Sequence, residues 1–128
     1  MNRNEFIKAY HDLIDTVKGA SEKARREGLL AIERDLDQKK ADDRDIFHYG
    51  MRFVLDGVAP EIINKILSNI IEQEKDEYSR RLKIIQKEAV LNIQQGINTK
   101  MLQYILNSYT DLTIADEDKN TGFVIVKG

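Results

Sequence analysis

The stretch PEIINKILSNIIEQEKDEYSRRLKIIQKEAVLNIQQ (60–95) decides which helical fold this chain adopts. Apolar residues recur at steps of three and four on both sides of a charged centre, EQEKDEYSRR (72–81), whose one apolar residue is Tyr78. This spacing places apolar side chains on one face of a helix. Because the centre contains no glycine or proline, the stretch predicts one near-continuous helix from Pro60 to about Gln95, roughly 54 Å long.

Similar spacing predicts shorter helices on both sides of this stretch, over residues 4–26, 45–55 and 99–109. Asn2 and Glu5 suit a capping box at the first helix, and Asn98 suits the start of the last. Residues 38–43 are polar and predict a loop. We therefore expect an all-α fold over residues 1–112, either an elongated helical hairpin or a small helical bundle.

The C-terminal tail, residues 113–128, has a different character. The polar run ADEDKNTG (115–122) precedes a short β-prone run, FVIV (123–126). Residues 123–126 either pair with residues 112–114 as a hairpin or belong to a frayed end, because two short strands alone are marginally stable. We expect a short flexible or β-prone tail outside the helical domain.

A change of direction is predicted at Gly28, inside EKARREGLLAIERDLD (22–37). Beyond this glycine the apolar positions Leu29, Ile32 and Leu36 are rotated by roughly a quarter turn from those of the first helix, at ~100° per residue. Glycine within a helix costs about 1 kcal/mol relative to alanine. The helix must kink, end or change its packing partner there, with charged residues clustered around the turn.

Composition excludes several functional classes. With 20 basic and 22 acidic residues the net charge is −2, without the basic excess typical of nucleic-acid binding. The chain has no cysteine and no run of 18 apolar residues, and its first residues show no signal-peptide pattern. Its two histidines, His11 and His48, lie apart from the acidic residues 72–77 and lack metal-ligand spacing. We expect neither an enzyme nor a bound cofactor or metal.

Two parts of the chain resemble one known family. KARREGLLAIERD (23–35), followed by FHYGMRFVLDGVAPEIINKIL (47–67), is similar to the cytoplasmic loop of the flagellar motor stator protein MotA. KEAVLNIQQGINTKMLQYILNSY (87–109) resembles the family's other cytoplasmic portion, which follows its last membrane helix. Together the matches cover roughly residues 6–112, in the family's order.

The chain departs from this family between the two parts. MotA-type proteins have four membrane helices, two of them between the regions that match here. In this chain the parts are joined near residues 77–83 with nothing hydrophobic between them. A fusion of cytoplasmic parts and a naturally shortened relative both fit this pattern. In either case the resemblance implies that the chain alone does not conduct ions.

The resemblance implies a function and a location. Such a chain would be soluble by itself and would form part of a stator on the cytoplasmic side of the bacterial inner membrane. The intact stator would contact the rotor switch protein FliG, have a MotB-like partner and turn ion flow into torque. Without membrane helices, self-association would be weak. The alternative is a generic helical adaptor or assembly module with no motor role.

Four charged residues are candidates for the rotor contact. By resemblance these are Arg25 and Glu33. Helical geometry adds Arg26, which lies seven residues before Glu33 and so on one line of a continuous helix, and Arg34 as a second substitute. The alternative is that these charges bind no partner and are only the solvated face of a helix. A rival docking mode would use the apolar residues Leu29, Ile32 and Leu36.

Overall fold

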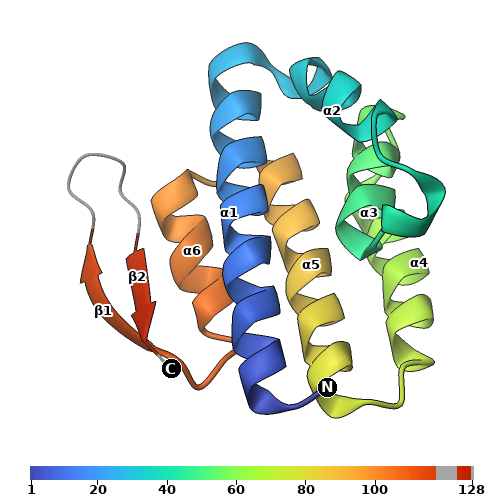
Figure 1. The fold of residues 1–128 in the computed structure, drawn as a ribbon. Helices are drawn as coiled ribbons and strands as arrows, with labels where there is room; N and C mark the ends of the chain where they lie inside the picture. Colours follow the sequence, from blue (N-terminus) through green and yellow to red (C-terminus); the bar gives the residue numbers. More distant parts are fainter. Residues whose placement is uncertain (118–123, 128) are drawn as a thin grey trace.

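A computed structural model of the protein describes residues 1–117 and 124–127. Within this part of the chain, six α-helices form a small bundle, with α5 in contact with α1, α3, α4 and α6 (Figure 1). This confirms the predicted all-α class. The helices are α1 (Arg3–Glu27), α2 (Glu33–Asp37), α3 (Ile46–Leu55), α4 (Pro60–Glu72), α5 (Glu77–Gln95) and α6 (Thr99–Asn107), with short 3-10 turns η1 (Leu29–Ile32) and η2 (Ala41–Asp43).

The start of α1 confirms the predicted capping box. The Asn2 side-chain oxygen accepts a hydrogen bond from the Glu5 amide at 2.8 Å, and the Glu5 carboxylate accepts one from the Asn2 amide at 2.9 Å. At α3 and α6 a single side chain makes the cap: Asp45 accepts a hydrogen bond from the His48 amide, and Asn98 accepts one from the Met101 amide. These caps satisfy amide groups that a helix leaves without an internal partner.

The predicted continuous helix from Pro60 to Gln95 is wrong. Helix α4 ends at Glu72 and α5 begins at Glu77, so residues 73–76 form a tight turn. The Asp76 carboxylate caps α5 by accepting a hydrogen bond from the Ser79 amide at 2.8 Å. Charged residues that suit an exposed helix therefore serve here to end one helix and begin another.

Polar contacts of Glu74 hold this turn closed. Lys83 donates to the Glu74 carboxylate at 2.8 Å, and Arg80 donates to the Glu74 main-chain carbonyl at 2.7 Å. Of the acidic residues in this stretch, Glu74 thus binds a lysine and Asp76 caps the start of α5. No group of three acidic or histidine residues arranged for a metal occurs among the described residues.

Burial explains why the chain reverses at this point. The reversal packs the apolar face of α4 against that of α5, and six side chains of these faces are almost completely buried: Ile63, Leu67, Ile71, Ile85, Ala89 and Val90. Burying a large aliphatic side chain is worth about 1.5–3 kcal/mol. An unbroken helix would hold the two faces far apart and forgo most of this burial.

Helices α3 and α5 approach each other closely at Gly50. A Cβ atom on Gly50 would lie 2.6 Å from Val90 Cγ2 and 3.1 Å from Leu67 Cδ1. The glycine therefore permits the backbone of α3 to sit on the side chains of α4 and α5. Tyr78, the apolar residue of the charged stretch, stacks on Phe6 with ring centroids 5.1 Å apart and so packs against α1.

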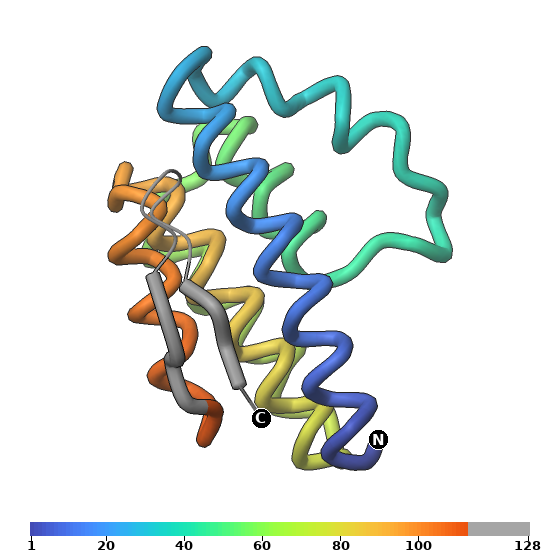
Figure 2. Tube along the Cα trace, turned by 60° about the vertical axis from the view of Figure 1, so that its left-hand side comes forward, coloured from blue at the N-terminus to red at the C-terminus, as the bar shows by residue number. Residues whose placement is uncertain are grey.

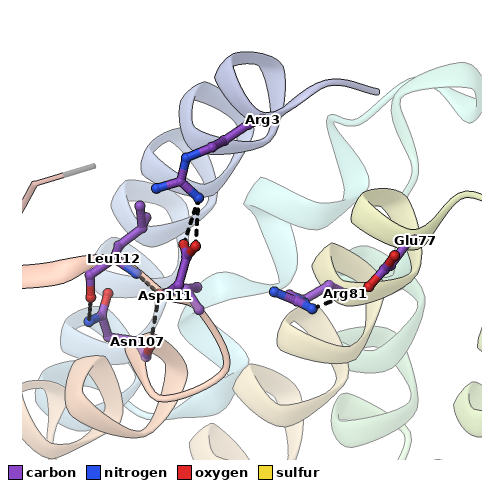
Figure 3. Close-up of polar contacts among 7 residues, drawn as sticks. Arg3, Glu77, Arg81, Asn107, Asp111 and Leu112 are labelled. Atoms are coloured by element: carbon purple, nitrogen blue, oxygen red, sulfur yellow. Dashed lines mark hydrogen bonds and ion pairs between the residues drawn. The ribbon is translucent and has the colours of Figure 1, made fainter.

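The N-terminus, the α4–α5 turn and the end of α6 meet at one end of the bundle, which we call the base. The Met1 ammonium lies 3.1 Å from the Asp76 carboxylate in that turn. Arg3 donates to both carboxylate oxygens of Asp111 at 2.7 and 2.8 Å, and Asn107 donates to the Leu112 carbonyl at 3.0 Å (Figure 3). Three segments far apart in sequence are thereby joined at the base.

Beyond the base the tail forms two strands. Thr113–Glu117 (β1) pairs antiparallel with Val124–Lys127 (β2), with an irregular register between Ile114 and Asp116. This is the hairpin alternative, shifted slightly along the sequence. The connecting polar residues 118–122 and Phe123 lie outside the described residues.

Candidate functional site

The four candidate residues lie at the end of the bundle opposite the base, which we call the tip: the last turn of α1, η1, α2 and the end of α5 around Gly96. Gly28 ends α1 with φ 93° and ψ 160°, a backbone conformation that residues other than glycine rarely adopt. The chain then arches away from α1 before it returns to α3 (Figure 2). The predicted change of direction at Gly28 is confirmed.

This turn overturns one geometric expectation. Arg26 and Glu33 were expected on one line of a continuous helix, but α1 ends at Glu27 and α2 begins at Glu33. Because the backbone changes direction at the glycine, the two residues belong to different helices and their sequence spacing does not place them on one face. That geometric reason for preferring Arg26 is wrong.

Arg25 ties the tip to the end of α5. Its Nη1 donates a hydrogen bond of 2.6 Å to the main-chain carbonyl of Gly96, the left-handed residue that closes α5. A positive charge beside the carbonyl end of a helix is favourable. The side chain is nevertheless exposed to solvent. Arg25 therefore has a structural contact in addition to any partner it binds.

Glu33 is held by a residue that sequence reasoning missed. Arg52 on α3 lies 3.7 Å from the Glu33 carboxylate and also pairs with Asp37 at the end of α2. On the other side of α2, Lys23 of α1 donates to Asp35 at 3.1 Å. None of these three pairs has a helical spacing of three or four residues, so no sequence pattern indicated them. Together they fix α2 between α1 and α3.

Arg26 and Arg34 are the more available cations of the tip. The Arg26 side chain is 67% exposed, and among the described residues it forms an ion pair only with the adjacent Glu27, at 3.4 Å. Arg34 is exposed, and its side chain has no hydrogen bond or ion pair with any residue that the structure describes. A partner can therefore bind these two guanidinium groups with little cost in broken internal contacts.

The rival apolar docking mode does not fit this arrangement. Ile32 and Leu36 are 3% and 7% exposed and belong to the core, and Leu29 is half-buried against it. The apolar side chain that the tip presents to solvent is Leu30, which is 72% exposed. The surface of the tip is therefore a charged one with a single prominent leucine.

Comparisons with known proteins point to one kind of relative. The chain is 36% identical over 76 residues to a motility protein A of Borreliella burgdorferi, an alignment that covers 59% of this chain and 27% of that protein. It is 28% identical over 110 residues to a motility protein A of Treponema phagedenis, covering 86% of this chain and 39% of that protein. No family model and no solved structure matches.

These findings confirm the resemblance to MotA that the sequence predicted. The chain spans well under half the length of both relatives. Among the described residues, every helix is too short or too polar to cross a membrane. The similarity therefore concerns a helical part of such proteins.

Proposed function

We propose that this chain is the cytoplasmic, rotor-facing part of a MotA-like flagellar motor stator, which contacts FliG through charged residues and transmits torque. In the intact assembly it would act with membrane helices and a MotB-like partner. Two facts support the proposal: the likeness to motility protein A, and the order of the two segments that resemble the family's cytoplasmic regions. The observation that carries it furthest is the arrangement of the base.

The points to which membrane helices would attach, the N-terminus and the α4–α5 turn, lie together at the base. In a MotA-like protein such helices would precede residue 1 and would lie between the counterparts of α4 and α5. In this chain Met1 and the α4–α5 turn are in direct contact, since the Met1 ammonium pairs with Asp76 at 3.1 Å. All these attachment points therefore fit one membrane surface at the base.

The tip then faces away from the membrane. Helix α1, with 25 residues, extends for about 37 Å at 1.5 Å per residue and separates base from tip. This polarity presents Arg25, Arg26, Glu33 and Arg34 to a rotor below the membrane. Exposed ion pairs are individually worth about 0–1 kcal/mol, which suits a contact that must release as readily as it forms.

Binding to the rotor-helix domain of FliG tests the proposal. Titration calorimetry should show weak binding that falls markedly between about 0.05 and 0.5 M salt, because charges are screened over ~8 Å at physiological ionic strength. Glu33→Lys and Arg34→Glu should each weaken binding, and a compensating reversal on the rotor helix should restore part of it. Lys65→Glu is the matched control, since Lys65 is exposed on α4, a helix that is not part of the tip.

Two outcomes would count against the proposal. Salt-independent affinity that Glu33→Lys leaves unchanged would exclude contact through charges. Absence of any binding by the folded chain would favour the adaptor alternative, in which the tip charges are only a solvated surface.

A further inference from the structure

A cavity lies beneath the segment that joins α1 to α3. It has a volume of about 240 Å³. Its wall is largely apolar and is formed by Ala20 of α1, Ile32 and Leu36 of the arching segment, and Phe47 and Met51 of α3. An apolar cavity of roughly 150 Å³ accommodates benzene. This one therefore has room for an aromatic ring with a short chain.

The charged residues of the wall are mainly acidic. Asp15, Asp35 and Asp45 line the cavity together with one cation, Lys39. Asp35 already pairs with Lys23, and Asp45 accepts the amide hydrogen bond of His48. Asp15 is exposed, and its side chain has no hydrogen bond or ion pair with another described residue. Its carboxylate is therefore free to bind a cation at the mouth of the cavity.

His48 adds a second, independent feature. The residue lines the cavity and is 5% exposed, yet its Nδ1 has no hydrogen-bond partner among the described residues. Burial, together with the nearby cations Arg44 and Arg52, lowers the pKa of His48 and favours the neutral ring. A neutral imidazole has one nitrogen that accepts a hydrogen bond. Buried polar groups without a partner are rare and call for an explanation such as a ligand.

We propose that this cavity binds a small apolar amine. The apolar body would pack against Phe47, Met51 and Leu36, and the ammonium group would lie at the mouth, near the Asp15 carboxylate. An ammonium donates hydrogen bonds and accepts none, which matches carboxylates and a neutral imidazole. A carboxylate ligand would be repelled by the three aspartates. This site is separate from the charges of the tip and does not depend on a motor role.

Gly19 provides a way to fill the cavity without disturbing the fold. It lies within α1 and lines the cavity, and a Cβ atom built on it meets no atom within 4 Å. A leucine at this position therefore enters open space, and it also replaces a residue that disfavours helix. Gly19→Leu should stay folded with the cavity blocked. Gly19→Ala is the matched control, which adds one methyl group and leaves most of the space.

The test is an NMR titration of the full chain with phenethylammonium chloride, followed through amide shifts. We expect saturable shifts at residues of the cavity wall, and affinity about threefold or more above that of the neutral isostere 2-phenylethanol. Phenylacetate should bind less well than either. Asp15→Asn should remove most of the cation's advantage while the alcohol still binds. Gly19→Leu should abolish binding of both, and Gly19→Ala should retain it.

Three results would overturn the proposal. The first is no saturable shift with phenethylammonium up to about 20 mM, a concentration that detects even very weak sites. The second is unchanged binding in folded Gly19→Leu, which would place the ligand elsewhere. The third is equal affinity for phenylacetate, which would show that the carboxylates select nothing.

Discussion

The Arg25 guanidinium donates a 2.6 Å hydrogen bond to the main-chain carbonyl of Gly96, joining the ends of α1 and α5 across 71 residues of sequence. The residue that the MotA resemblance selects for rotor contact thus also holds two helices together. A binding defect in an Arg25 variant would therefore mix two effects. Stability must be measured beside affinity for this residue.

Arg25→Ala should lower the free energy of unfolding by about 1 kcal/mol, because it removes a charge-assisted hydrogen bond at a solvent-exposed site. Arg25→Lys should retain part of this stability through its charge near the end of α5. Arg26→Ala is the control and should change stability by less than about 0.5 kcal/mol, since that side chain pairs only with Glu27 among the described residues. Urea unfolding measures all three. Equal losses for Arg25→Ala and Arg26→Ala would show that the Gly96 contact contributes nothing.

The two helical glycines Gly50 and Gly19 should respond oppositely to alanine. Gly50→Ala would bring a methyl group to 2.6 Å from Val90 Cγ2, and such overpacking costs typically 1–3 kcal/mol. Gly19→Ala meets open space and should stabilise the protein by about 0.5–1 kcal/mol through helix propensity. Thermal unfolding of both variants checks the signs. A stabilised Gly50→Ala would mean that α3 does not pack closely on α5.

Local signals in the sequence predicted the helix ends well. The capping box of Asn2 and Glu5, the cap at Asn98, and the turn at Gly28 all depend on residues within a few positions of each other. The prediction of one long helix was wrong because the break between α4 and α5 depends on side-chain burial across the whole fold. Residues 73–76 contain no helix breaker, yet folding α4 back on α5 buries two apolar faces at once.

At the candidate site, too, local features were predictable from the sequence and contacts between distant segments were not. The sequence placed the charges near a change of direction, and the structure puts them at the tip. The sequence did not indicate that Arg52 pairs with Glu33, or that Arg25 binds Gly96, because these contacts join different helices. The cavity was also missed, since its wall comes from three separate segments. Contacts at such separations follow from the packing of the bundle and carry no sequence periodicity.

Stability should fall at mildly acidic pH because of His48. Burial lowers the pKa of this histidine below its usual 6.5, with further effects of Arg44, Arg52 and Lys39 that Asp45 partly opposes. The unfolded chain then binds a proton more readily than the folded chain, so acid favours unfolding as pH drops below about 6.5. Urea unfolding between about pH 7.5 and 5 should show this slope. The slope should be smaller in His48→Leu, whatever that variant's overall stability, and an unchanged slope would exclude His48 as its source.

Asp76 should contribute to stability above about pH 4 but not in strong acid. Its pKa is lowered from 3.8 to about 2, first by the hydrogen bond from the Ser79 amide and then by the Met1 ammonium. A carboxylate with a lowered folded pKa stabilises the protein above its unfolded pKa and loses that effect as pH falls through the folded value. Asp76→Asn keeps a capping oxygen and removes the charge. It should be less stable than the parent at pH 7, with a difference that shrinks toward pH 2, and a constant difference would contradict the assignment.

The α4–α5 turn should accept a long insertion, as expected if membrane helices occupy this place in a MotA-like stator. About eight Gly and Ser residues between Gln73 and Glu74 would leave the contacts of Glu74 with Arg80 and Lys83 on the α5 side intact. Lengthening a short loop about threefold costs only ~1 kcal/mol in closure entropy. The same insertion between Leu82 and Lys83 is the control, because it interrupts α5 and should cost several times more or prevent folding. Circular dichroism and urea unfolding report both variants. Equal damage at the two positions would show that the turn is an essential part of the fold and a poor place for inserted helices.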